Sequence, residues 1–296
     1  MKLPWLVLSL GALGACDASS MDSFDAGTDG AVRPDAPPGC TRPAIDATWL
    51  QGQLTTWISG LASAPRALST QRTTARTYLM NQLATIGWTA QLVTYTTGAN
   101  VAVTIPATMG GTGKEIIVGA HFDTVLDSPG ANDNASGVAV VLAVARYLVD
   151  VPCRTSPVTI VLFDGEENGL VGSRAYAPTK TAANVRAVHT IDQVAWDQDN
   201  DLRFELEMPT ATLEAEYRAA AQIVGALVTT VPTEGTDHEA FRERGFAAIG
   251  LTEEYVGGDT SPYRHLMTDT PATVDTPYLV LAAKLTAQVI IDEVAP

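Results

Sequence analysis

The sequence predicts an α/β fold with a mixed, mostly parallel central sheet that is flanked by helices on both faces. Short β-branched apolar runs alternate with segments of helical length along much of the 296-residue chain, which is the pattern of β-α-β units and of their parallel strands. Three of these runs stop at residues of the kind that bind metals. Ligands of open α/β sheets bind outside the carboxyl ends of the strands, so the residue types agree with the predicted topology.

The first elements expected are helices over residues 44–62 and 71–86, followed by a hairpin-like pair of strands over 88–95 and 100–105.

The core of the sheet is then expected to begin. Strands are predicted over 115–120, 158–163 and 186–191, with a helix over 135–149 and another after Glu167. The remaining apolar pattern predicts a helix over 213–224, a strand over 247–251 and a closing helix over 277–293. This alternation favours crossover connections and a mostly parallel sheet.

Residues 1–15 are typical of an export signal: Lys2 precedes an apolar stretch that ends at Leu13, and small residues follow. Leu13-Gly14-Ala15-Cys16 resembles the lipobox of bacterial lipoproteins, which predicts cleavage before Cys16 and lipidation of its sulfur. The alternative is ordinary cleavage and a free thiol. We therefore expect an exported protein that contacts the membrane only through a lipid anchor on the periplasmic or surface side of the bacterial envelope, or a secreted protein without lipidation.

Residues 16–42 are rich in Asp, Ala, Ser, Gly and Pro, and such a composition predicts a disordered tether. Residues 43–296 are then expected to form one domain of ordinary size. Cys40 and Cys153 are an even pair in an exported chain, so they are either a disulfide or two free thiols. A formal net charge of −15 argues against a nucleic-acid partner. The oligomeric state stays open.

Five metal-binding side chains stand out, four of them at or soon after the end of an apolar run, and together they predict a two-zinc hydrolytic centre: His121, Asp133, Glu167, Asp192 and His265. Asp133 lies among small residues before a long apolar helix, and one carboxylate can bridge two metals through its two oxygens. The alternative for Asp133 is a helix N-cap, although Asn134 can take that role instead.

The adjacent carboxylates of Glu166 and Glu167 repel each other unless cations or protons offset their charge. Glu167 is expected to bind metal while Glu166 acts as a general base; a solvated acidic turn is the alternative. His238-Glu239 does not begin a zincin helix, because Arg242 occupies the place of the second histidine. His189, inside a strand, is expected to be a packed histidine.

Five segments together resemble a family of zinc aminopeptidases that includes bacterial leucyl aminopeptidases, plasma glutamate carboxypeptidase and glutaminyl cyclases. The resemblance runs from about Gln71 to the C-terminus and implies the zinc exopeptidase (phosphorylase/hydrolase-like) fold. The segments are Gly119-Ala-His-Phe-Asp-Thr, Gly130-Ala-Asn-Asp-Asn-Ala-Ser-Gly, Gly165-Glu-Glu-Asn-Gly-Leu-Val-Gly-Ser, Thr236-Asp-His-Glu-Ala-Phe and His265-Leu-Met-Thr-Asp-Thr.

The resemblance implies two Zn²⁺ ions per chain. One is held by Asp133, Glu167 and His265, and the other by His121, Asp133 and Asp192. It further implies that Asp123 orients the His121 imidazole and that Glu166 is the general base for attack by zinc-bound hydroxide on a peptide bond. In this family Asp237 and His238 look structural, so they are left out of the metal set.

Some members of the family carry a tyrosine directly before the last zinc-binding histidine, where this chain has Arg264. The donor to the oxyanion is therefore open among Tyr263, Arg264 and Tyr255. The expected activity is aminopeptidase, because carboxylates that could bind a free α-ammonium lie near the strand ends: Glu166, Asp192, Glu253 and Glu254.

Three other functions remain as alternatives. A carboxypeptidase would need a cation for the terminal carboxylate, which Arg264 offers, and a glutaminyl cyclase would bind one zinc. A catalytically silent binding module on the same fold is the third. The sequence leaves the preferred substrate side chain open.

Overall fold

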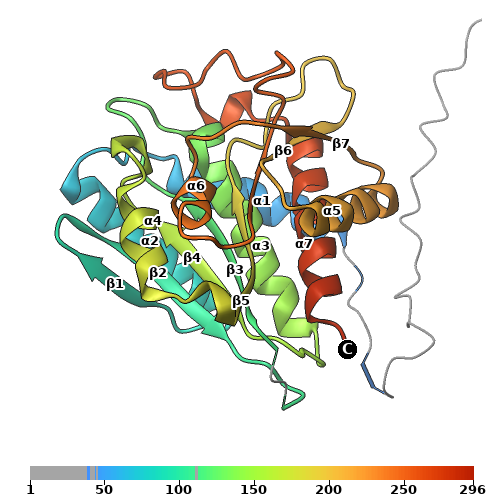
Figure 1. Cartoon of the computed structure of the whole chain (residues 1–296). Coiled ribbons are helices and arrows are strands. Elements are labelled where there is room, and N and C mark those ends of the chain that lie inside the picture. Colours follow the sequence, from blue (N-terminus) through green and yellow to red (C-terminus); the bar gives the residue numbers. More distant parts are fainter. Residues whose placement is uncertain (1–38, 41–43, 45, 111–112) are drawn as a thin grey trace, which may run out of the picture.

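The computed structural model describes residues 39–40, 44, 46–110 and 113–296 (Figure 1). The predicted signal peptide, Cys16 and most of the predicted tether lie outside these residues. Within the described part of the chain, no helix combines the length and the apolar character needed to cross a membrane.

The described residues form one eight-stranded sheet in the order β1-β2-β4-β3-β5-β8-β6-β7. The four central strands, β4, β3, β5 and β8, run parallel, as do β6 and β7, while β1–β2, β2–β4 and β6–β8 pair antiparallel. The predicted mixed, mostly parallel sheet is confirmed. The strands are β1 (Gln91–Tyr95), β2 (Gly98–Ile105), β3 (Glu115–His121), β4 (Val158–Phe163), β5 (Val185–Ile191), β6 (Arg203–Glu207), β7 (Leu227–Val231) and β8 (Ala248–Thr252).

Helices cover both faces of this sheet. On one face α4 and α6 pack through a small aromatic cluster that includes Phe163, Tyr176 and Phe241. The larger core lies on the other face, beneath α1, α2, α3, α5 and α7. The helices are α1 (Ala47–Leu61), α2 (Ser69–Ile86), α3 (Gly137–Asp150), α4 (Val171–Tyr176), α5 (Ala211–Val224), α6 (His238–Arg242) and α7 (Thr276–Val294).

The central strands and α3 are buried because their sequences are almost wholly apolar. All six residues of β4, Val-Thr-Ile-Val-Leu-Phe, are buried, as expected for a parallel strand covered on both faces. Two of the long helices begin at side chains that accept backbone N–H groups: Asp46 accepts from Thr48 and Trp49 at α1, and Asp275 accepts from Tyr278 at α7.

The sequence patterns above do not predict β6, β7 or α6, and they place several element ends a few residues away from the observed ones. β6 reads Arg-Phe-Glu-Leu-Glu, and its two glutamates are buried. Glutamate is disfavoured in strands, so a five-residue run with two of them gives a weak signal. Its burial depends on partners from distant loops.

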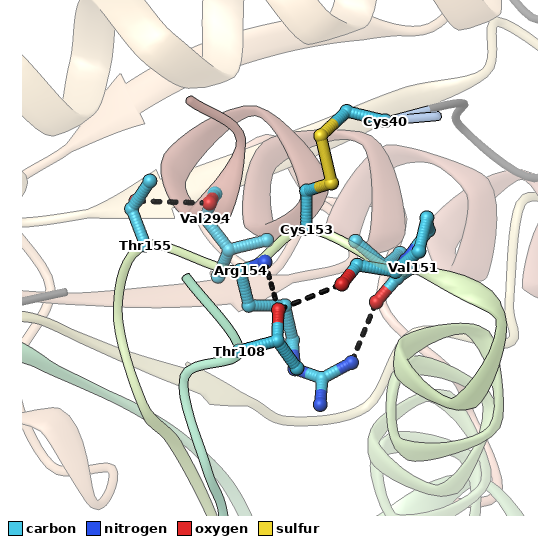
Figure 2. The surroundings of a disulfide bond; sticks show 8 residues. Cys40, Thr108, Val151, Cys153, Arg154, Thr155 and Val294 are labelled. Atoms are coloured by element: carbon cyan, nitrogen blue, oxygen red, sulfur yellow. Dashed lines mark hydrogen bonds between the residues drawn. A yellow bond between two sulfur atoms is a disulfide. The ribbon is translucent and has the colours of Figure 1, made fainter. Parts of the chain in front are cut away.

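The structure joins Cys40 and Cys153 in a disulfide, with Cα atoms 5.3 Å apart (Figure 2). Cys153 lies in the connection between α3 and β4, at the amino end of the parallel strands. Its neighbours fix this connection in place: the Arg154 N–H donates to Thr108 Oγ1, and Thr155 Oγ1 donates to the Val294 carbonyl. The bond therefore holds the start of the described chain at the edge of the sheet opposite the carboxyl ends of the parallel strands.

Candidate metal centre

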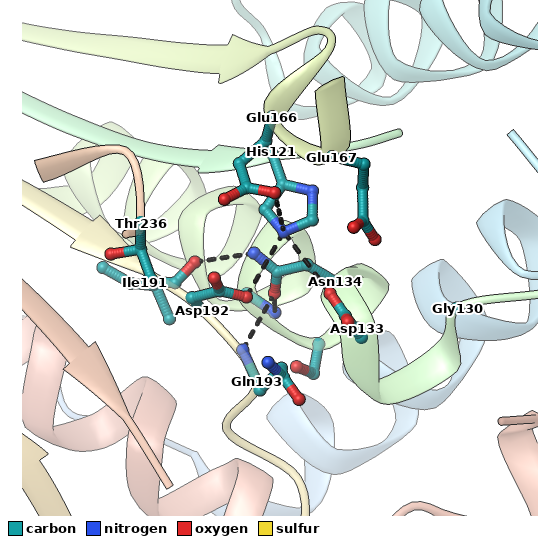
Figure 3. Close-up of polar contacts among 12 residues, drawn as sticks. His121, Gly130, Asp133, Asn134, Glu166, Glu167, Ile191, Asp192, Gln193 and Thr236 are labelled. Atoms are coloured by element: carbon teal, nitrogen blue, oxygen red, sulfur yellow. Dashed lines mark hydrogen bonds and ion pairs between the residues drawn. The ribbon is translucent and has the colours of Figure 1, made fainter. Parts of the chain in front are cut away.

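The predicted metal-binding side chains come together at the carboxyl ends of the parallel strands. His121 is the last residue of β3, Asp192 follows β5 directly, and the turn with Glu166 and Glu167 follows β4. Figure 3 shows the carboxylates of Asp133, Glu166 and Asp192 around the His121 imidazole. Parallel strands end at one edge of a sheet, so this part of the cluster follows directly from the topology.

The five side chains form two groups that share Asp133. In the first, His121 Nε2 lies 3.4 Å from Asp133 Oδ1 and 3.3 Å from Asp192 Oδ1. In the second, His265 Nε2 lies 3.1 Å from Asp133 Oδ2 and 3.2 Å from Glu167 Oε2. The ligand atoms of each group lie within 4.8 Å of one another. Asp133 therefore offers one oxygen to each group, as a bridging ligand must.

Neighbouring side chains fix the backbone around Asp133. Asp269 is fully buried and accepts the N–H groups of Asn132 at 2.8 Å and of Asp133 at 3.0 Å. Asn134 Oδ1 accepts the Gly137 N–H at the start of α3, so the cap role falls to Asn134 and leaves the Asp133 carboxylate free. Gly130 begins this loop at φ +62°, where an added Cβ would lie 2.3 Å from the Asp133 carbonyl oxygen.

Asp123 connects His121 to the acidic turn. Its carboxylate lies 3.5 Å from His121 Nδ1 and accepts the backbone N–H groups of Glu166 at 3.0 Å and Glu167 at 3.2 Å. One buried carboxylate therefore lies beside the Nδ1 atom of the imidazole and also positions the backbone of the two glutamates.

His265 reaches the cluster from the long connection between β8 and α7. Its backbone has φ +62°, a left-handed conformation that costs a non-glycine residue about 1–3 kcal/mol. Residues of this kind cluster at ligand sites, where the surrounding structure holds them. The side chain is 39% exposed, so it forms the solvent side of the centre.

The donor set fits zinc. Imidazole nitrogens and carboxylate oxygens are ordinary zinc ligands at about 2.0–2.2 Å, and each group offers three protein ligands. Among the described residues, Glu167 Oε1 is buried without a hydrogen-bond donor. Buried carboxylate oxygens without donors are costly, and a bound cation would satisfy them.

The electrostatics of the centre also favour a cation. Burial raises the pKa of Glu166 to about 10 and that of Glu167 to about 7. Burial alone would lower the pKa of His121, but Asp192 and Glu166 together raise it well above its usual range. Without a cation these carboxylates compete for protons, and a metal ion can displace those protons.

A cavity of about 200 Å³ opens beside the cluster, and Glu166, Glu167, Asp192, Tyr255 and Arg264 are among its lining residues. Tyr263 is not among its lining residues, and its ring makes a T-shaped contact with Trp196.

Two of the predicted ammonium-binding residues, Glu253 and Glu254, lie outside the cavity lining. Glu253 is fully buried, and its carboxylate accepts from Asn132 Nδ2 and the Ser261 N–H. Glu254 lies 3.3 Å from Arg203. Neither lines the cavity, whereas Glu166 and Asp192 do.

The remaining histidines lie outside both metal groups. His189 is fully buried, with Nε2 3.1 Å from Glu293 and Nδ1 3.2 Å from the Tyr217 hydroxyl. His238 Nδ1 contacts Thr236 at 2.7 Å.

Sequence reasoning did not find Arg66. Its guanidinium donates to the carbonyls of Phe122, Pro129 and Gly130, and it thereby holds the two loops that carry Asp123 and Asp133. No local pattern marks an arginine whose partners are backbone carbonyls. Asp269 could have been found from the sequence, because it lies within the family-like segment His265-Leu-Met-Thr-Asp-Thr.

Comparison with known proteins agrees with this geometry. Residues 100–290 match the profile described as Peptidase family M28, and the chain belongs to this family. The resemblance seen in the sequence segments is thereby confirmed. The "Probable lipoprotein aminopeptidase LpqL" of Mycobacterium tuberculosis is 38% identical over 160 residues, which are 48% of this chain and 32% of that protein. The chain covers about a third of the length of such curated relatives.

Solved structures show the same fold. An aminopeptidase from Aneurinibacillus sp. strain AM-1 has a TM-score of 0.73 at 15% identity, covering 85% of this chain and 97% of that one. A glutaminyl cyclase from Porphyromonas gingivalis has a TM-score of 0.71 at 18% identity, covering 82% of this chain and 98% of that one. At these identities the similarity concerns the fold alone.

Proposed function

We propose that this protein is a two-zinc aminopeptidase that removes N-terminal residues from peptides. The observation that supports it most is the pair of three-ligand groups that share Asp133 through different oxygens, His121–Asp133–Asp192 and Asp133–Glu167–His265. A one-metal centre does not need this sharing.

Zinc bound in these groups would polarise the substrate carbonyl and lower the pKa of a water molecule to about 7. Glu166 is the base. Its Oε2 lies 3.9 Å from His121 Nε2, its side chain is 12% exposed, and it lines the cavity. In this position it takes the proton from the attacking water and returns it to the leaving amine. Asp123 positions both His121 and the Glu166 backbone, as described above.

Arg264 is the oxyanion donor in this proposal. It lines the cavity, and its buried Nε has no hydrogen-bond acceptor among the described residues. The guanidinium lies over the Tyr255 ring, 5.4 Å from its centroid, and this contact limits its orientations. A free donor directed at the developing negative charge lowers the barrier of acyl transfer.

Two features favour an aminopeptidase over the alternatives. The cavity is smaller than the 300–1,000 Å³ that is typical of sites for larger ligands, so it suits one terminal residue. The carboxylates of Glu166 and Asp192 at its wall suit an α-ammonium group. A measurement of zinc per chain distinguishes a two-zinc aminopeptidase from a glutaminyl cyclase, which would bind one zinc.

We also propose that the chain is exported, cleaved before Cys16 and anchored by lipid, with residues 43–296 as the catalytic domain. The relative LpqL is named as a lipoprotein. Because the Cys40–Cys153 disulfide lies at the edge of the sheet opposite the metal-binding residues, the tether would leave the domain on the far side from the active site, and the site would face away from the membrane.

The test uses the exported protein purified from a bacterial host. Zinc per chain is measured together with release of amino acids from unblocked and N-acetylated aminoacyl amides, with and without a chelator. About two zincs per chain and chelator-sensitive cleavage of unblocked amides alone are expected. Zinc without such cleavage would favour a carboxypeptidase or a cyclase, and a protein with neither zinc nor cleavage would favour a binding module.

A further inference from the structure

The part of the cavity away from the metal-binding residues is acidic and rich in hydroxyl groups. Its lining there comprises Glu207, Thr233, Glu234, Thr236 and Thr252, with the Tyr255 ring at one side. Among the residues that the structure describes, no aliphatic side chain lines the cavity. Pockets that bind apolar groups are lined mainly by apolar side chains, so a leucine-like side chain has no matching surface here.

Glu207 lies on the same sheet as the metal-binding residues, two strands away from β5, which ends just before Asp192. It is the last residue of β6 and pairs with Gly250 of β8, which in turn pairs with Thr190 of β5. Two strand spacings amount to about 10 Å, and Thr190 is two residues before Asp192. A substrate whose carbonyl lies at the metal centre can therefore extend its N-terminal side chain toward Glu207.

Gly250 makes room for the Glu207 carboxylate. A Cβ at this position would lie 2.2 Å from Glu207 Oε2 and 3.0 Å from His238 Nδ1. Any other residue in β8 would push the carboxylate out of its place. The glycine thus permits a carboxylate at the floor of the cavity.

No cation offsets the charge of Glu207 within the described residues. Its side chain is 3% exposed, and the one basic group within ion-pair distance is His238, 3.4 Å away. Burial, helped by Arg242, lowers the pKa of His238 to about 4, so this imidazole is neutral. The Thr236 hydroxyl donates to Glu207 Oε2 at 2.9 Å. A buried carboxylate of this kind lacks a positive partner.

We infer that this pocket selects a cationic N-terminal side chain, lysine or arginine, with Glu207 at its floor and the exposed Glu234 at its mouth. The inference rests on the proposed aminopeptidase function and adds its substrate class. A bound ammonium or guanidinium would form a charge-assisted hydrogen bond with Glu207. Burial raises the pKa of Glu207 to about 8, and the cation would offset this cost of ionisation.

The test compares kcat/KM for the 4-nitroanilides of lysine, arginine, leucine and norleucine, the last being an uncharged side chain of similar length. In the zinc-loaded wild type we expect kcat/KM for the lysine substrate to exceed that for the norleucine substrate at least about tenfold. Glu207→Gln should remove this preference, while kcat/KM for the norleucine substrate changes less than about threefold. Glutamine has the shape of a protonated glutamate, so the Thr236 contact can remain. Glu234→Gln should lower kcat/KM for the lysine and arginine substrates only, and by a smaller factor than Glu207→Gln does. This effect should be larger at low salt, where charges are less screened.

A second measurement does not depend on turnover. Free lysine should raise the unfolding temperature of the wild type more than norleucine does, and Glu207→Gln should abolish the difference. A wild type that cleaves norleucine and leucine better than lysine would overturn this inference and leave the aminopeptidase intact, whereas cleavage of no unblocked substrate would defeat the proposed function itself. An equal loss for all four substrates in Glu207→Gln would show that Glu207 is structural. If Glu207→Gln does not fold, the inference is tested by the lysine preference of the wild type and by the reduction of that preference in Glu234→Gln.

Discussion

Replacing Asp123 with asparagine tests whether one buried carboxylate organises the metal centre. The Asp123 side chain is fully buried, lies 3.5 Å from His121 Nδ1 and accepts the N–H groups of Glu166 and Glu167 at 3.0 and 3.2 Å. Asparagine keeps the shape and one acceptor oxygen, but it replaces the other oxygen with an NH₂ group and removes the charge. The His121 imidazole loses its charged partner, and the acidic turn loses one acceptor.

The expected loss follows from these contacts. Removing a partner behind a metal-bound histidine typically lowers metal affinity or activity about 10- to 100-fold, which corresponds to about 1.4–2.7 kcal/mol. We therefore expect Asp123→Asn to bind zinc about 10- to 100-fold more weakly, with a similar loss in kcat/KM at limiting zinc. Excess zinc should restore part of the activity.

Zinc affinity is measured by competition with a chelator of known affinity, and kcat/KM by hydrolysis of an unblocked aminoacyl substrate over a range of zinc concentrations. Asp150→Asn is the matched control, because Asp150 lies at the exposed end of α3 and pairs with Arg146 at 2.7 Å. Thermal unfolding of the metal-free proteins shows whether the fold is kept. Zinc affinity in Asp123→Asn within about twofold of the wild type would refute the reasoning, because the expected loss is at least tenfold.

Three further predictions concern the base, the oxyanion donor and a buried ion pair. Glu166→Ala should keep both zincs and lose at least about 100-fold in kcat, whereas His265→Ala should lose metal as well. Arg264→Ala should lower kcat about 100- to 1,000-fold with little change in KM. Glu293→Gln should reduce the free energy of unfolding by about 1.5–3 kcal/mol at neutral pH, because Glu293 is buried against His189 at 3.1 Å. Burial alone would raise the pKa of Glu293, but His189 and Arg186 outweigh it and lower this pKa below its ordinary value of 4.5. The increment is therefore complete above that value and is lost as pH falls through the lower folded-state pKa, so the stabilities of wild type and variant in urea unfolding should converge as pH falls below that pKa.

Each of these has its own contrary result. Near-normal turnover in Glu166→Ala would remove Glu166 as the base. A change in Arg264→Ala confined to KM would place Arg264 in substrate binding. A difference between wild type and Glu293→Gln that is unchanged at low pH would show that the pair does not titrate as argued. Glu214→Gln is the control for the last variant, since Glu214 lies on the surface of α5 and pairs with Arg218.

The strand-end part of the site was predictable from the sequence, for a local reason. A β-branched apolar run that stops at His121, another before Asp192 and a third before Glu166 and Glu167 mark buried parallel strands, and such strands deliver their last residues to one edge. The same runs predicted the α/β class. The Arg264 departure was also visible, because it lies directly before a histidine of a recognisable segment.

The tertiary structure alone decided what each remaining polar residue does. Glu253 and Glu207 are both buried glutamates near the carboxyl ends of strands, yet Glu253 is satisfied by Asn132 and Ser261, whereas Glu207 faces the cavity without a cation. Tyr263 and Tyr255 lie close together in the sequence, yet Tyr255 lines the cavity whereas the Tyr263 ring packs against Trp196.

The sequence by itself therefore determined the fold class, the family and which candidate metal-binding residues lie at the strand ends, because these depend on periodicity and on short segments. Long-range packing decided the rest. It determines which loop carries each polar side chain to the centre, how Asp133 directs one oxygen toward each histidine, and which carboxylates line the cavity. Burial and hydrogen-bond partners fix the charge and the direction of a polar side chain, and both come from segments far away along the chain.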